Sequence, residues 1–303
     1  MCLDHGTHGG KTQEDKSMLE RRMVVQALAA GGALTATGCA TNAETGASQF
    51  LLVGDRQLSQ MAASSWAEAK QKTPVSRDPR YTRRLETIGG RISRGANKHN
   101  EAWDYAVFDS DTKNAFVLPG NRVGFYKGMM DFAESDDQIA AIMGHEVGHV
   151  TGKHAAERVS QQLGGQVALT GLSIGLGVAG ARGCNKYQGA ERSQCLSRNQ
   201  RNTQLAGAAL GLGFQYGIIL PYSRKHESQS DLLGAKYMHK AGYDPYQAVK
   251  LWEKMAEANP NRPPEFMSTH PDPSRRARDL HNYIKYQEQL GSQGWESIKL
   301  PKS

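Results

Sequence analysis

The segment from Ala140 to Val150 constrains this chain more than any other, because His145, Glu146 and His149 form a His-Glu-x-x-His motif within it. Residues four apart lie on one face of a helix, so the two imidazoles can point at one metal ion. Glu146 then lies beside that metal. Two neutral imidazoles and a carboxylate suit a hydrolytic zinc site, where the metal lowers the pKa of a water to about 7 and the carboxylate accepts its proton.

The residues around the motif favour this interpretation over two ordinary core or surface histidines. Five apolar residues surround it, which indicates a buried helix where unpaired histidines would be costly, namely Ile139, Ile142, Met143, Val147 and Val150. Gly144 and Gly148 flank the histidines and would let another element approach closely.

A catalytic zinc has three protein ligands and one open position, so a third ligand must come from elsewhere. A metzincin pattern accounts for Gly152 but places its third histidine at Ala155, and His154 comes one residue too early. Glu227 and Asp231, spaced i, i+4 on an expected helix, provide a second motif. We expect Glu227 to be the third ligand, and Asp231 to accept a hydrogen bond from a ligand histidine and fix its tautomer.

Two other interpretations of this second motif remain. His226 is a rival ligand, although on a helix it faces about 100° away from Glu227. The segment could also be a solvated charged turn, since Arg224 and Lys225 lie alongside.

Together with Ser268-Thr269-His270-Pro271, these two motifs resemble the HtpX and CAAX-prenyl-protease family of gluzincin metallopeptidases, and within it the bacterial lipoprotein members of the LoiP/YggG kind. The resemblance covers residues 75–285. It implies an α+β, mainly helical zinc endopeptidase domain, with one zinc ion per chain and a small β-sheet beside the His-Glu-x-x-His helix. It also implies that the strand before this helix is an edge strand able to pair with an extended substrate.

Hydrolysis of a peptide also requires a positive or hydrogen-bonding group at the developing oxyanion. His270 is the candidate, on a loop stiffened by Pro271 and Pro273. In the resembling family, a histidine at this place lies near the zinc and either stabilises the intermediate or occupies the open metal position. Arg275 and Arg276 are alternatives for the oxyanion role. The ordinary interpretation of His270 is a surface or helix-capping histidine.

The N-terminal residues have the form of an export signal. Arg21 and Arg22 precede a short apolar run from Met23 to Leu34, and the lipobox-like sequence Ala36-Thr37-Gly38-Cys39 follows it. The run is shorter than the roughly 20 residues of a membrane span, so we expect residues 1–38 to be a lipoprotein signal peptide with its n-region. A twin-arginine signal is a variant of this reading, and Met18 is a second candidate start.

The rest of the chain is expected to comprise a lipidated tether at 39–60, a metallopeptidase domain at 61–290 and a tail at 291–303. Alternation predicts a strand at 103–108 and a hairpin of two strands through residues 119–121. Within the domain, residues 163–220 are rich in glycine. We expect a helical hairpin there beside the active site, with membrane insertion as the alternative.

Cysteine usage supports export. Cys184 and Cys195 form an even pair within the expected exported domain, which favours a disulfide over two free thiols. The net charge of +7 is dispersed, without a basic stripe interleaved with aromatic residues. We therefore expect no nucleic-acid partner, and the positive charge weakly favours attraction to anionic membrane surfaces.

The expected function is a periplasmic zinc endopeptidase held to the outer membrane by lipid on Cys39. By resemblance, its substrates would be misfolded or misassembled envelope proteins, and an outer-membrane assembly machinery is a possible partner. The rivals are a non-proteolytic chaperone or assembly factor on the same fold, which the intact Glu146 disfavours, and an integral membrane protease.

Overall fold

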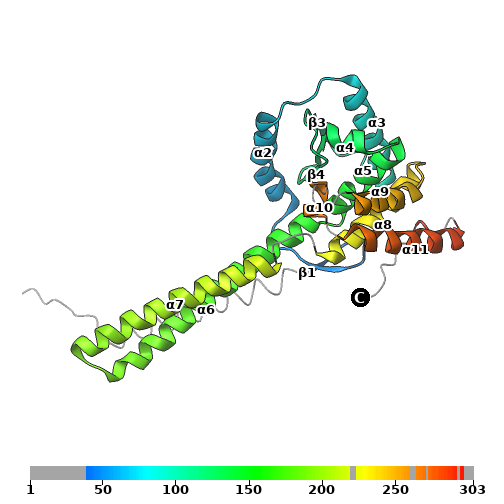
Figure 1. Ribbon diagram of the computed structural model, residues 1–303. Coiled ribbons are helices and arrows are strands. Elements are labelled where there is room, and N and C mark those ends of the chain that lie inside the picture. The colour runs from blue at the N-terminus through cyan, green and yellow to red at the C-terminus, as the bar shows by residue number, and fades with distance from the viewer. Residues whose placement is uncertain (1–38, 219–222, 259–263, 271, 292–293, 297–303) are drawn as a thin grey trace, which may run out of the picture.

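The computed structural model describes residues 39–218, 223–258, 264–270, 272–291 and 294–296. A helical body encloses a small sheet, and a long two-helix hairpin projects from it (Figure 1). This is the mainly helical α+β architecture that the sequence predicted. The expected signal peptide at 1–38 lies outside the described residues.

The segment expected as a tether is instead docked on the body. Strands β1 (Cys39–Thr41) and β2 (Ser48–Phe50) pair antiparallel, and helix α2 (Asp55–Lys72) follows. The buried amide of Asn42 donates to the carbonyl of Thr151 at 3.0 Å, and that of Gln49 to the carbonyl of Gly152 at 2.6 Å. These carbonyls belong to the end of a helix, where backbone acceptors have no partner within the helix. The segment docks because it satisfies them.

A three-stranded sheet follows helix α3 (Pro79–Gly95), with β5 (Arg122–Tyr126) between β3 (Asp104–Phe108) and β4 (Ala115–Leu118). Strand β3 is parallel to β5 and β4 is antiparallel to it. The expected hairpin is present, and its turn at 119–121 uses positive φ angles at Gly120 (87°) and Asn121 (58°). The strand before the His-Glu-x-x-His helix was expected at the sheet edge, but that strand is β5, and it is central because β3 and β4 pair with its two sides. The edge position belongs to β4, one strand earlier in the chain.

Helices α4 (Lys127–Phe132) and α5 (Asp136–Thr151) come next, and α5 carries the His-Glu-x-x-His motif. The side chain of Ser135 caps α5 by accepting from the Gln138 N–H at 3.2 Å. Asp136 and Asp137 occupy its first turn, where the positive end of the helix dipole stabilises negative charge. Nearly all of α5 from Gln138 onward is buried, as the apolar surroundings of the motif indicated.

The C-terminal part consists of α8 (Arg224–Lys240), α9 (Tyr246–Glu257), the short α10 (Phe266–Thr269) and α11 (Pro273–Gln289). Their apolar faces form one core with α3, α5 and the sheet, and the largest buried side chains include Trp252, Tyr237, Phe125 and Phe266. In the segment expected as a tail, Trp295 is buried and stacks on His239 with ring centroids 4.3 Å apart.

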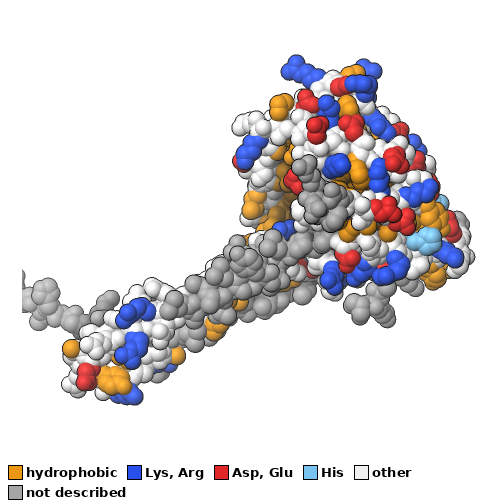
Figure 2. All heavy atoms as spheres, viewed as in Figure 1, with side chains coloured by type: hydrophobic (Ala, Val, Ile, Leu, Met, Phe, Trp, Pro, Cys, Tyr) orange, Lys and Arg blue, Asp and Glu red, His pale blue; other side chains and the backbone are white. Residues whose placement is uncertain are grey.

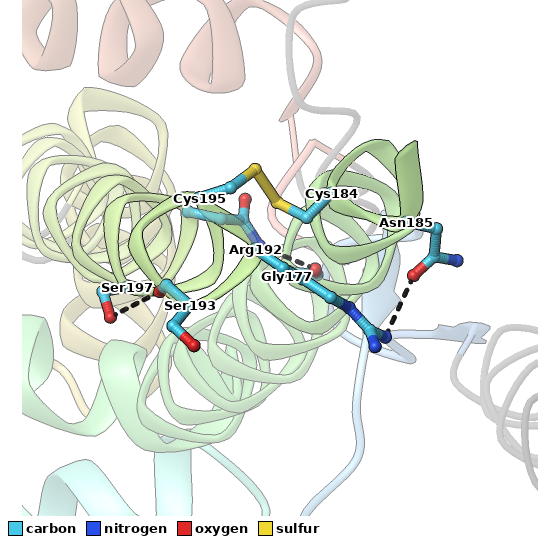
Figure 3. Close-up of a disulfide and its surroundings, with 8 residues drawn as sticks. Gly177, Cys184, Asn185, Arg192, Ser193, Cys195 and Ser197 are labelled. Atoms are coloured by element: carbon cyan, nitrogen blue, oxygen red, sulfur yellow. Dashed lines mark hydrogen bonds between the residues drawn. A yellow bond between two sulfur atoms is a disulfide. The ribbon is translucent and has the colours of Figure 1, made fainter. Parts of the chain in front are cut away.

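Helices α6 (His154–Gly183) and α7 (Gly189–Ile218) form the expected hairpin, joined through a 3₁₀ turn at Cys184–Lys186. Only the base of this hairpin lies beside α5, and the remainder extends away from the body (Figure 1). The expected disulfide joins Cys184, in this turn, to Cys195 on α7 (Figure 3).

Candidate metal centre

The two helices that carry the predicted ligands cross at unusually close range. A Cβ atom on Gly148 would lie 2.8 Å from the carbonyl oxygen of Ser230, and one on Gly144 would lie 3.0 Å from that of Gly234. A Cβ atom on Gly234 would in turn lie 2.9 Å from the amide nitrogen of His145. Glycine on both helices therefore allows α5 and α8 to touch backbone to backbone. This contact places the histidines of α5 beside the carboxylates of α8.

His145, His149 and Glu227 meet at this crossing. Nε2 of His145 lies 3.1 Å from Nε2 of His149 and 3.4 Å from Oε2 of Glu227. Nε2 of His149 lies 3.5 Å from Oε1 of Glu227. All three side chains are buried. Their nitrogen and oxygen atoms are the donors that Zn²⁺ prefers in proteins, and they converge on one point.

His270 joins the same cluster from the loop after α10. Its Nδ1 lies 3.1 Å from both carboxylate oxygens of Glu227 and 3.1 Å from Nε2 of His145. One donor atom from each of His145, His149, Glu227 and His270 lies within 4.8 Å of the other three. The structure thus places His270 among the predicted ligands, with its ring stacked on Phe266 at 4.2 Å between centroids.

Glu146 is buried beside the cluster. Its carboxylate accepts a hydrogen bond from the main-chain N–H of Val117, on edge strand β4. Within the described part of the chain, Oε1 makes no hydrogen bond, and it lies 3.5 Å from Nε2 of His270. Burial, together with the charge of Glu227, raises the pKa of Glu146 to about 8. A buried carboxylate oxygen without a donor, aimed at a ligand cluster, fits a site that holds a cation and a water molecule.

Asp231 and Arg276 support the cluster from behind. Oδ1 of Asp231 lies 3.0 Å from Nδ1 of His145, which fixes the ring so that Nε2 faces the other ligands. Arg276 donates to both oxygens of Asp231 and lies 3.0 Å from Oε2 of Glu227. Burial lowers the pKa of His145, but its bonds to Asp231 and Glu227 outweigh this and raise the pKa to about 9. Metal therefore competes with a proton at His145.

His154 is a site residue that sequence reasoning missed. Its Nδ1 lies 3.0 Å from Nδ1 of His149, and its Nε2 lies 2.9 Å from the side-chain oxygen of Gln229. Burial, aided by the neighbouring His226, lowers the pKa of His154 to about 3, and burial also lowers that of His149. Both rings are therefore neutral. If Nδ1 of His149 donates to His154, Nε2 of His149 carries no proton and can bind a metal ion.

The remaining candidates lie outside the four-residue cluster. His226 stacks on His154 at 4.3 Å between centroids, and its Nε2 lies 3.2 Å from Oε2 of Glu157. It is therefore not among the clustered donor atoms. Arg275 pairs with Asp272 at 3.3 Å on the half-exposed side of α11. Arg276, one residue on, is the arginine that reaches the site.

The comparison with known proteins agrees with this geometry. A model of peptidase family M48 matches residues 79–284, from the first residue of α3 into α11. The chain belongs to peptidase family M48. The match includes both helices of the crossing and the loop that carries His270. With the clustered donors, M48 membership identifies a zinc metallopeptidase domain.

Several curated proteins are similar to this M48 chain. A beta-barrel assembly-enhancing protease of Yersinia pestis is 26% identical over 257 residues, which cover 81% of this chain and 46% of that protein. That of Escherichia coli K12 is 25% identical over 258 residues, covering 84% and 48%. The mitochondrial metalloendopeptidase OMA1 of Schizosaccharomyces pombe is 29% identical over 184 residues, covering 60% and 47%. The chain spans about half the length of these relatives.

Proposed function

We propose that this M48 chain is a zinc endopeptidase of the bacterial periplasm that hydrolyses misfolded or misassembled envelope proteins. The observation that carries the proposal is the buried Glu146, whose Oε1 has no hydrogen-bond donor among the described residues and faces the donor cluster. A carboxylate in this position is placed to act as general base. The similarity to beta-barrel assembly-enhancing proteases supports envelope proteins as the substrate class.

Each residue of the site has a distinct role in this proposal. His145, His149 and Glu227 hold the zinc ion, which when bound supplies a Lewis acid that polarises a carbonyl and acidifies water. Glu146 accepts a proton from the attacking water and returns it to the departing amine. Asp231 orients His145 through Nδ1, and His154 orients His149 in the same way. Arg276 holds Asp231 and Glu227 in their charged forms, because a buried cation favours both carboxylates.

His270 has two possible roles, and its position supports one of them. A catalytic zinc keeps an open position, whereas four donor atoms converge here. We infer that His270 would occupy the position that a catalytic zinc leaves open, because its Nδ1 lies among the donor atoms of the three proposed ligands. Substrate hydrolysis would then require the loop after α10 to move His270 aside.

Substrate backbone would bind along β4. This strand is at the edge of its sheet, and the N–H of Val117 already reaches Glu146. A pocket of about 400 Å³ lies between β4 with its turn, α2 and the end of α5, and it is lined by His149 as well as by Val117 and Leu118. Pairing with an edge strand binds extended peptide through main-chain groups, which suits unfolded chains of varied sequence.

Export and anchoring complete the proposal. Cys39 begins β1, and the lipobox-like sequence before it lies outside the described residues. Acylation of Cys39 would hold the domain to the outer membrane, because several acyl chains together make anchoring stable.

Casein hydrolysis by the purified chain tests the function, with a chelator present or absent and zinc restored afterwards. A zinc endopeptidase loses activity with chelator and regains it with zinc. A chain that suppresses aggregation of unfolded protein but never cleaves casein would be the chaperone of the rival reading. Envelope proteins retained by a Glu146→Gln variant in cells would identify the substrates.

A further inference from the structure

The projecting hairpin exposes a row of large apolar side chains. Leu163, Val167, Ile174 and Val178 on α6 are 47, 55, 61 and 42% exposed. Their spacing of four, seven and four residues places them on one face of the helix. We call these four residues the α6 stripe. Soluble surfaces rarely present such a row to water, and a large exposed apolar patch indicates an interaction site.

The hairpin is basic around its tip. Residues 182–201 contain five basic residues and one acidic residue, Glu191. The basic residues are Arg182, Lys186, Arg192, Arg198 and Arg201, and Figure 2 shows such side chains gathered at the tip. A row of apolar residues next to an excess of positive charge is the composition that binds anionic membrane surfaces.

The partner helix argues against a membrane-spanning hairpin. Among the described residues, one helical segment, His154–Lys186, is long and apolar enough to cross a membrane. The first half of its neighbour α7, however, carries four charged residues, namely Glu191, Arg192, Arg198 and Arg201. This half lies beside the distal part of α6, because the Asn199 side chain donates to the Gly177 carbonyl at 2.9 Å. Charged side chains at the centre of a bilayer are costly, so an orientation in the plane of the interface is favoured.

The start of the folded chain lies at the base of the same stripe. Cys39 pairs with Phe50 across β1 and β2. The ring of Phe50 would lie 3.0 Å from a Cβ on Gly164, the residue after Leu163. A lipid on Cys39 would therefore leave the protein beside the first residue of the stripe. This step rests on the proposed lipidation, whereas the stripe and the basic tip do not.

We propose that the α6–α7 hairpin is a membrane-binding arm that lies in the headgroup region of an anionic bilayer. The α6 stripe enters the boundary with the acyl chains, and the basic residues of the tip contact phosphate groups. The arm holds the catalytic body at the membrane surface, where substrate chains that fail to insert are exposed.

The hairpin contains a matched control for this proposal. Leu172 is 48% exposed, like the stripe, but it lies about half a turn away on the opposite side of α6. An in-plane arm buries the stripe and leaves Leu172 in water, whereas a spanning helix would bury both. We compare a Val167→Asp/Ile174→Asp variant with Leu172→Asp. All chains carry Cys39→Ala, so that acylation plays no part.

The experiment is flotation of each full-length chain with vesicles of phosphatidylethanolamine and phosphatidylglycerol, or of phosphatidylcholine alone. Because residues 1–38 also contain an apolar run, amide hydrogen exchange in α6 is measured with and without vesicles, which reports on the hairpin alone. We expect binding to the anionic vesicles, protection of α6, and loss of at least tenfold in the stripe variant. Leu172→Asp should bind as the parent does, and Arg198→Glu/Arg201→Glu should weaken binding to the anionic vesicles.

Three results would overturn the proposal. Equal loss in Leu172→Asp would indicate a spanning helix. If neither type of vesicle slows amide hydrogen exchange in α6, the stripe would be a binding surface for a protein and not for a membrane. Binding to phosphatidylcholine vesicles as strong as to the anionic vesicles would show that the basic residues do not contribute to binding. Casein hydrolysis by each variant in solution checks that the catalytic body is folded, since none of these residues belongs to the site, and the outcome for the arm is independent of whether Cys39 is acylated.

Discussion

Arg276 donates two hydrogen bonds to Asp231, from Nη2 to Oδ1 at 2.6 Å and from Nε to Oδ2 at 2.8 Å. The guanidinium is buried, lies over the Trp252 ring at 4.2 Å, and also approaches Glu227 at 3.0 Å. One cation therefore balances two buried carboxylates. Glu227 is a proposed zinc ligand, and Asp231 contacts His145, another proposed ligand. Arg276 is part of the electrostatics of the site rather than an exposed oxyanion donor.

Replacing Arg276 should destabilise the metal-free protein. We expect Arg276→Met to cost about 3–5 kcal/mol in urea unfolding, because both carboxylates lose their buried counterion. The deficit should shrink with zinc bound, since the metal restores positive charge. The neighbouring Arg275→Met is the control, because Arg275 pairs with the partly exposed Asp272 and Asp279 rather than with the buried carboxylates of the site. Equal losses in the two variants would contradict a special role for Arg276.

Glu146→Gln should retain zinc and lose hydrolysis. The amide keeps the shape of the side chain but cannot accept the proton from water, and general-base catalysis typically contributes a factor of about 10²–10⁴. Zinc content per chain and casein hydrolysis are measured on the same preparation. Undiminished activity would exclude Glu146 as the base.

Glu227→Ala and Asp231→Ala should differ in their effect on zinc binding, because Glu227 is the proposed ligand and Asp231 only orients a ligand histidine. We expect Glu227→Ala to lose zinc during dialysis, because it removes a donor atom. Asp231→Ala should lower zinc affinity by about 10–100-fold, the usual effect of removing a residue that orients a ligand histidine. Competition with a chelating dye measures both. An unchanged affinity in Glu227→Ala would move the third ligand elsewhere.

His270→Ala should leave zinc in place and raise casein turnover, because on our proposal His270 would occupy the open metal position and the variant would free it. The three other ligands remain, so zinc per chain should not change. His281→Ala, an exposed histidine on α11, is the matched control. A lower turnover would instead assign His270 to the oxyanion, and unaltered kinetics would remove it from the reaction.

Gly148→Ala should weaken both the fold and the metal site. The added methyl would lie 2.8 Å from the Ser230 carbonyl, and overpacking of this kind typically costs about 1–3 kcal/mol. The helices α5 and α8 would separate, so zinc affinity should fall as well. Gly171→Ala on α6 provides the contrast, because no described residue lies within 4 Å of its added Cβ. That change should stabilise the helix by up to about 1 kcal/mol.

The sequence alone was enough to predict the local elements of this site. His145, Glu146 and His149 share a helix face because residues four apart must do so, and the same holds for Glu227 and Asp231. Alternating residues predicted the strand at 103–108 and the hairpin through Gly120. The pair Cys184 and Cys195 predicted the disulfide. Each of these depends on periodicity, short spacing or residue type, which a single chain displays directly.

Only the tertiary structure decided which residues from separate elements meet. His154 supports His149, and Arg276 rather than Arg275 reaches Asp231, because α5, α8 and α11 pack in one particular arrangement. No local pattern encodes that arrangement, since it depends on how side chains of all three helices fill the shared core. Docking of Gln49 at the end of α5 replaced the expected tether for the same reason. Spacing along the chain determined the chemistry of the metal ligands, and packing determined the residues that orient and balance them.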